Sequence, residues 1–151
     1  MTADDETVAR NLALMKRADD DFNARDYTAF LDERHHPEVV VHQTGLPAPT
    51  HTLAAHRREI EALIRAFPDV HVHNDPYEVA FGQGGWTTAV GRLTGTFTGE
   101  LIGPDGTAIS PTGRAFDVTF TTIARWREER IVEERVLWDG AALARQIGLT
   151  G

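Results

Sequence analysis

The chain has 151 residues, 41% hydrophobic and 25% charged, which is typical of a single folded domain with a hydrophobic core, so we treat residues 1–151 as one domain. A formal net charge of −8 argues against nucleic-acid binding, and no apolar run is long enough to cross a membrane. The absence of cysteine excludes disulfides and thiolate chemistry, and together with a polar, acidic start it favours a cytoplasmic protein.

Two helices are predicted at the start of the chain. The first covers residues 7–24, because apolar side chains recur there every three or four residues: Val8, Leu12, Met15 and Phe22. Asp19 lies on the same stripe, so it either belongs to a solvated acidic run or points into a cavity under the helix. A second, short helix over residues 27–34 ends before Pro37.

A strand over residues 39–43 and a third helix follow. His42, near the end of this strand, either reaches a cavity or has a capping or surface role. After a loop rich in Gly and Pro, Thr50 or Thr52 caps a helix over residues 53–66. His56 lies on the apolar face of this helix, either as a core histidine or as part of a cavity wall.

The segment His71-Val72-His73 invites a metal-site interpretation, but alternation predicts that its histidines lie on an outer sheet face. No third ligand stands at a suitable spacing, so we expect no metal site.

Three long strands follow, over residues 86–100, 114–126 and 131–138. Glycines at every fourth position of the first one, Gly91, Gly95 and Gly99, predict a strongly curved sheet. Asp139 is a good N-cap for a closing helix that ends at Gly148. The order of elements predicts an α+β fold, in which helices cover one face of a curved, mostly antiparallel sheet and leave a conical pocket.

Five segments in this order resemble the SnoaL-like polyketide cyclases, which have the nuclear-transport-factor-2-like cone fold. The segments are AFPDV (66–70), GTFTGE (95–100), PTGR (111–114), RW followed by a turn and RIVEE (125–134), and WDGAALARQIG (138–148). The resemblance indicates the fold more specifically than the reaction, because one fold hosts many activities.

For the cyclases, the resemblance implies an intramolecular aldol ring closure on an aromatic polyketide ester, without a metal or organic cofactor, in a homodimer. An aspartate late in the last strand and a histidine on the preceding strand move the proton. In this chain the corresponding positions fall on Val136 and Thr122, which cannot take over those roles. The loss favours the family's hydroxylase-type members of anthracycline pathways, which work with a separate reductase.

Strand alternation places Glu134 and Trp138 on the face of Val136, and Phe120 on the face of Thr122. Glu134 is either a carboxylate of the inner wall or a salt-bridged surface residue. Asp139 either handles protons at the pocket edge or only caps its helix. The catalytic candidates are His42, Asp139, Glu134 and Asp19, and the substrate-binding candidates are Phe22, His56, Trp86, Phe120, Thr122, Val136 and Trp138.

Three functions stay open at this point. The first is hydroxylase-type tailoring of a polycyclic aromatic polyketide in antibiotic biosynthesis. The second is an aldol cyclase in which Asp139 or Glu134 replaces the missing base. The third is a protein that binds a small aromatic ligand without turnover and carries no histidine–carboxylate pair inside the cone.

Overall fold

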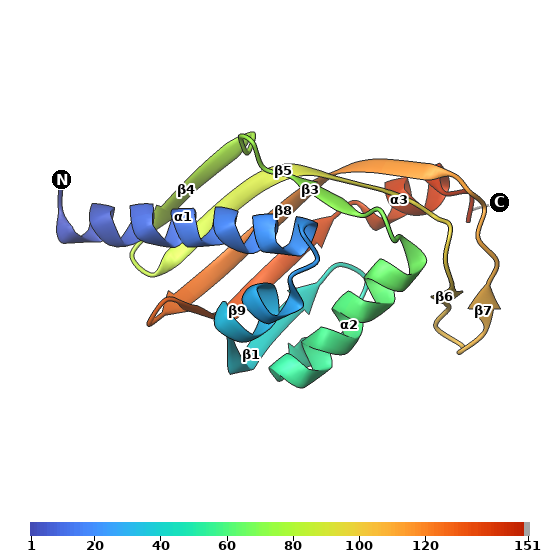
Figure 1. Ribbon diagram of the computed structural model, residues 1–151, viewed down its shortest axis with the longest axis horizontal. Coiled ribbons are helices and arrows are strands. Elements are labelled where there is room, and N and C mark those ends of the chain that lie inside the picture. Colours follow the sequence, from blue (N-terminus) through green and yellow to red (C-terminus); the bar gives the residue numbers. More distant parts are fainter. Residues whose placement is uncertain (150–151) are drawn as a thin grey trace.

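The computed structural model describes residues 1–149, which form three α-helices, a π-helix and nine strands (Figure 1). In chain order they are α1 (Ala3–Asn23), the π-helix η1 (Thr28–Glu33), β1 (His35–Gln43), β2 (Thr50–His51), α2 (Leu53–Ala66), β3 (His71–His73), β4 (Val79–Gln83), β5 (Trp86–Thr96), β6 (Leu101–Ile102), β7 (Ala108–Ile109), β8 (Ala115–Arg127), β9 (Arg130–Trp138) and α3 (Gly140–Gln146).

Helix α1 begins four residues earlier than the apolar stripe alone predicts. Thr2 is its N-cap, and the Thr2 and Asp5 side chains each bind the other's backbone N–H in a capping box. Asp4, Asp5 and Glu6 fill the first turn, where negative charge is favourable against the helix dipole. The polar start of the chain is therefore a helix start.

Strand β1 also begins four residues earlier than predicted. It pairs in parallel with β9, first through His35 and Ile131 and then, after a shift of register, from Val40 and Glu133 onward. The irregularity spans Pro37, which has no backbone N–H to donate to a ladder. Because of this early start, the His35 side chain enters the interior, where it is 1% exposed.

The main sheet has seven strands in the order β2-β1-β9-β8-β5-β3, with β4 also paired to β5. All of its pairs except β1–β9 are antiparallel. Thr122 on β8 lies directly opposite Val136 on β9, and Phe120 lies opposite Trp138. The predicted sharing of faces along these two strands is confirmed.

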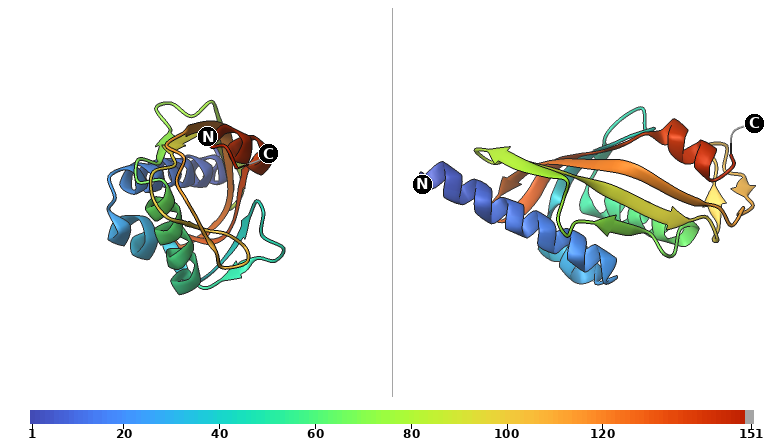
Figure 2. Two further views of the ribbon diagram at one scale, coloured as in Figure 1. Left: turned by 90° about the vertical axis from the view of Figure 1, so that its right-hand side faces the viewer. Right: turned by 90° about the horizontal axis from the view of Figure 1, so that it is seen from above.

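Helices α1 and α2 lie over one face of the curved sheet, with α3 and the β6–β7 hairpin at the end away from the N-terminus (Figures 1 and 2). The strand predicted over residues 86–100 ends at Thr96, so Gly99 lies after the sheet rather than in it. The chain passes close to the end of α2 at Gly99, where a Cβ atom would lie 1.7 Å from the Arg65 carbonyl oxygen. Only glycine fits there. The predicted α+β fold with a cone-like, helix-covered sheet is confirmed, and the sheet is not closed into a barrel.

Two buried apolar clusters form the core. One joins α1, α2, β5 and β8 around Phe22, Phe67, Phe97 and Phe116. The other lies between α1 and the opposite part of the sheet around Met15, Val41 and Trp126. Within residues 1–149 the structure contains no helix with the length and apolar character of a membrane span.

Candidate active site

A cavity of about 310 Å³ lies between the helices and the inner face of the sheet, a volume suited to a small-molecule ligand. Most of its wall is apolar. The lining side chains come from Met15, Ala18, Asp19, Phe22, Phe30, His35, Gln43, His56, Glu59, Ile60, Leu63, Phe67, Val72, Leu93, Leu101, Phe120, Thr122, Ile131, Glu134, Val136, Trp138, Leu143, Ala144, Ile147 and Leu149.

Most of the candidates chosen from the sequence meet in this wall. Among the catalytic candidates, Asp19 and Glu134 line the cavity and are 7% and 5% exposed. The substrate-binding candidates that line it are Phe22, His56, Phe120, Thr122, Val136 and Trp138. For Asp19, Glu134 and His56, the structure therefore selects the cavity position over the surface or core alternative.

His42 does not reach the cavity, contrary to the expectation for it. Its Nε2 atom lies 3.5 Å from the Glu133 carboxylate, and its side chain is partly exposed. The neighbouring Val41 and Gln43 take the inward positions of β1, so period-two alternation turns His42 to the opposite face.

Trp86 and Asp139 also lie outside the cavity wall. Trp86 is 37% exposed, because on β5 it is the next residue, Thr87, that turns inward and accepts a hydrogen bond from Trp126. The Asp139 carboxylate accepts a hydrogen bond from the Ala142 N–H at 2.9 Å, so Asp139 is the N-cap of α3. Of the two roles considered for Asp139, the structure shows the helix cap.

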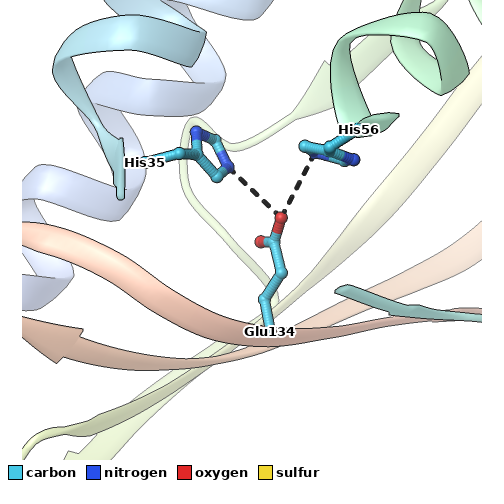
Figure 3. A group of neighbouring side chains, drawn as sticks. All are labelled: His35, His56 and Glu134. Carbon is cyan, nitrogen blue, oxygen red and sulfur yellow. Dashed lines mark hydrogen bonds and ion pairs between the residues drawn. The ribbon is translucent and has the colours of Figure 1, made fainter. Parts of the chain in front are cut away.

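The polar part of the cavity is a cluster of His35, His56 and Glu134, which come from β1, α2 and β9 (Figure 3). The Glu134 Oε1 atom lies 3.2 Å from His35 Nε2 and 3.4 Å from His56 Nε2. All three side chains are buried. The cluster therefore brings a carboxylate and two imidazoles to one point of an apolar wall.

The other ring nitrogen of each histidine also has an oxygen partner. His35 Nδ1 lies 2.9 Å from the Phe30 carbonyl oxygen, and His56 Nδ1 lies 3.3 Å from Glu59 Oε1. Glu59 is itself held by Gln43 and Thr50, which donate to its two carboxylate oxygens. The partners of the two Nδ1 atoms therefore hold both imidazole rings with Nε2 directed at Glu134.

Burial alone would raise the pKa of the Glu134 carboxyl, but the hydrogen bond with His35 and the nearby imidazoles of His35 and His56 bring it below its usual value. Glu134 is thus held as a carboxylate. It lies in a place where an unpaired negative charge would be costly.

Asp19 forms a second polar point of the cavity. Its Oδ2 atom accepts a hydrogen bond from the Tyr77 hydroxyl. Burial raises the pKa of the Asp19 carboxyl to about 7, although the bond from Tyr77 opposes the shift, and the charge of Glu134 adds to it. Burial and the charge of Asp19 raise the pKa of Tyr77, so Tyr77 stays a donor. Asp19 can accordingly gain or lose a proton near neutral pH.

His35 and Tyr77 are not among the residues predicted from the sequence. His35 stands between a predicted helix and a strand that was expected to begin only at Val39, so it was assigned to no face. Tyr77 lies in the segment between β3 and β4, where periodicity gives no direction for a side chain. The His35-His36 pair before Pro37 was the one available signal for an unusual strand start.

The sequence model of one protein family matches residues 13–147, and that family is described as SnoaL-like polyketide cyclase. The chain belongs to this family. No curated protein sequence matches it.

Solved structures agree with this assignment at the level of the fold. A protein of Jannaschia sp. CCS1, described as a SnoaL-like polyketide cyclase, has a TM-score of 0.81 and 20% identity, with 95% of each chain covered. AclR of Streptomyces galilaeus, described as a hydroxylase, has a TM-score of 0.77 and 18% identity over 95% of this chain and 99% of its own. IdmH of Streptomyces antibioticus, described as a polyketide cyclase, has a TM-score of 0.74 and 23% identity over 91% and 98%.

Within this SnoaL-like chain, the two positions that the resemblance assigns to the aldol acid–base pair are cross-strand partners. Thr122 and Val136 face each other on β8 and β9, and both line the cavity. Neither carries a group that titrates near neutral pH. The titratable groups of the cavity wall lie instead at Asp19, His35, His56, Glu59 and Glu134.

Proposed function

We propose that the protein is a tailoring enzyme for a polycyclic aromatic, polyketide-derived substrate, and that Asp19 is its proton-transferring group. The observation that carries this proposal is the buried position of the Asp19 carboxyl in the wall of an apolar cavity, where burial raises its pKa to about 7. A general base is most effective when its pKa lies near the working pH. The flat side chains of Phe22, Phe120 and Trp138 offer a surface on which an aromatic ring system can stack.

The reaction that this arrangement favours is an aldol-type ring closure. Asp19 removes a proton from the carbon next to one carbonyl group, and the resulting enolate carbon attacks a second carbonyl carbon of the same substrate. A C–C bond forms, the second C=O π bond breaks, and the alkoxide takes up a proton from the carboxyl group. The overall reaction consumes neither oxygen nor a reductant.

This proposal changes the order that the sequence favoured. The sequence put hydroxylation first, because Val136 and Thr122 replace the expected acid–base pair. The cavity wall contains other acid–base groups, as the second hypothesis, a cyclase with a relocated acid, requires. The groups at the cavity are Asp19 and Glu134 rather than Asp139. A pure binding protein was expected to lack histidine–carboxylate pairs inside the cone, whereas His35 and His56 both pair with Glu134.

Ring hydroxylation is the second candidate. The observation in its favour is the absence of a titratable side chain at Thr122 and Val136, the positions of the cyclase pair. AclR, which shares the fold, is described as a hydroxylase. This reaction would require oxygen and a separate reductase as a partner.

One experiment distinguishes the candidates. Aromatic polyketide keto-esters are incubated with the protein, with and without oxygen and a nicotinamide-linked reductase, and the products are analysed by mass spectrometry. We expect a product of unchanged mass, or one that has lost water, with the protein alone. Asp19→Asn should lower its rate by about 10²–10⁴-fold, the contribution typical of acid–base catalysis. Asp20→Asn, a neighbouring and half-exposed carboxylate, is the matched control and should retain the rate.

Two outcomes would contradict the cyclase proposal. A product that gains one oxygen atom, only in the complete mixture, would establish hydroxylation instead. An unaltered rate in Asp19→Asn would exclude Asp19 as the proton-transferring group.

A further inference from the structure

We propose that His35, His56 and Glu134 form a binding site for a divalent first-row transition-metal ion. The three ligand atoms, one from each side chain, lie within 4.8 Å of one another, and all three residues are buried. They come from three separate elements and converge on one point of the cavity wall (Figure 3). No metal site is predicted from the sequence, because His71 and His73 are the histidines whose spacing suggests one and they lack a third ligand.

The first argument comes from the protons of the imidazole rings. A carbonyl oxygen only accepts hydrogen bonds, so His35 Nδ1, at 2.9 Å from Phe30 O, carries a proton. His56 Nδ1 faces the Glu59 carboxylate at 3.3 Å and carries one for the same reason. With Nδ1 protonated, each Nε2 atom faces the Glu134 carboxylate either with a second ring proton or, once a cation has replaced that proton, with a lone pair. The point where the two Nε2 atoms and Glu134 Oε1 converge is thus a place for positive charge, which ring protons or a metal ion can supply.

The second argument comes from distances. If the positive charge were supplied by imidazolium protons, the N–H···O⁻ bonds would be expected at about 2.7–2.9 Å. The observed separations between Nε2 and Oε1 are longer, at 3.2 and 3.4 Å. Ligands bound at about 2.0–2.1 Å in tetrahedral geometry lie roughly 3.3–3.4 Å from one another. Both separations from Glu134 Oε1 agree with the spacing of metal ligands and are longer than those of short ion pairs, and all three ligand atoms lie within 4.8 Å of one another.

The third argument comes from the groups behind the ligands. A histidine that binds a metal through one nitrogen usually donates its other N–H to a backbone carbonyl or a carboxylate. His35 has the first of these partners and His56 has the second. Gln43 and Thr50 fix the Glu59 carboxylate in turn. Both rings are thus held in the tautomer and orientation that metal binding requires.

Two imidazoles and one carboxylate form a donor set used for catalytic zinc and for non-haem iron(II). Three protein ligands leave a coordination position, and all three side chains line the cavity, so that position would be open to a ligand. A metal ion there could polarise a substrate carbonyl group. This catalytic meaning rests on the proposed function, whereas metal binding itself does not.

The test uses the untagged chain of 151 residues after treatment with a chelator. Co²⁺ binding is followed by its visible absorption, Zn²⁺ binding by calorimetry, and Fe²⁺ binding under anaerobic conditions. We expect one ion per chain. His56→Ala and Glu134→Gln should each weaken binding at least about 100-fold, and Glu59→Gln, which leaves the three ligands in place, about 10–100-fold. The matched control, His71→Ala with His73→Ala, removes a surface histidine pair and should leave binding unchanged.

The proposal is overturned if no ion binds with a 1:1 ratio. It is also overturned if Glu134→Gln and Glu59→Gln bind as tightly as the unaltered protein, or if the control variant abolishes binding. Circular dichroism identifies any variant that fails to fold. If a ligand variant does not fold, the metal affinity of Glu59→Gln decides the test. Loss of turnover in Asp19→Asn together with no metal binding would refute only the metal site, while metal binding without any turnover would refute only the proposed reaction.

Discussion

At the scale of residues, burial and neighbouring charges set the pKa values of two carboxyl groups in the cavity. Asp19 and Glu134 both line the cavity, yet burial raises the pKa of Asp19 whereas imidazole neighbours lower that of Glu134. Groups whose environments drive their pKa values apart are typical of acid–base sites. Because its pKa is raised on folding, Asp19 also makes the free energy of unfolding depend on pH.

The free energy of unfolding should fall as the pH rises from about 4 to about 7, in part because of Asp19. The pKa of its carboxyl is about 7 in the folded protein and about 3.9 in the unfolded chain, so between these values the folded state binds more protons. At about 1.4 kcal/mol per unit, the loss attributable to Asp19 is at most about 4 kcal/mol. Urea unfolding at several pH values should show a flatter curve for Asp19→Asn.

Glu61→Gln, at an exposed position of α2, is the control for this measurement. Its unfolding curves should fall with pH as those of the unaltered protein do. A pH dependence of Asp19→Asn identical to that of the unaltered protein would show that Asp19 ionises normally.

At the scale of elements, strand starts and helix caps decide which side chains reach the cavity. The early start of β1 brings the His35 side chain within 3.2 Å of the Glu134 carboxylate, while the alternation of the same strand turns His42 away. Asp139 adjoins the cavity residue Trp138, but its side chain caps the N-terminus of α3. Proximity in sequence to a cavity residue is thus a poor guide to a role in the cavity.

Asp139→Ala should lower the free energy of unfolding by about 1 kcal/mol, because the Ala142 N–H loses its capping acceptor. Asp139→Asn should retain most of that stability, since asparagine is an equally good N-cap. Thermal unfolding and turnover, measured side by side, check both variants. A large loss of turnover in Asp139→Asn, with stability retained, would reinstate Asp139 as a proton-transferring group.

At the scale of the whole molecule, the curved sheet and the helices above it leave a space that the core clusters do not fill. One cluster lies around Phe22 and Phe97, the other around Val41 and Trp126, and the cavity wall draws on residues of both. An apolar cavity of this volume is maintained at a cost in packing, which is consistent with a ligand site.

Filling this space should block ligand binding while the fold persists. Val136→Phe adds volume to the wall between Glu134 and Trp138, so we expect at least a tenfold weaker affinity for a planar anthraquinone probe, measured by quenching of tryptophan fluorescence. Leu137→Phe, one residue further along β9 on the opposite, exposed face, is the matched control and should bind normally. Equal affinity in the two variants would place the ligand elsewhere.

Local patterns in the sequence were sufficient to predict much of the fold. The α+β class, the inward faces of β8 and β9, the cap at Asp139 and a cap of α2 at Thr50 or Thr52 were all predicted, because they depend on alternation, apolar spacing and short-range hydrogen bonds. Six of the seven predicted substrate-binding residues lie in the cavity wall for the same reason.

The sequence by itself therefore determined the main helices and long strands, the curved sheet and the inward-facing stripe that contains Glu134 and Val136. Only the tertiary structure decided that His35 and His56 meet Glu134, and that Tyr77 donates to Asp19. These partners are separated by tens of residues and lie on different elements. Their contact depends on the shifted register of β1 and on the path of the chain before β4, which no local periodicity encodes.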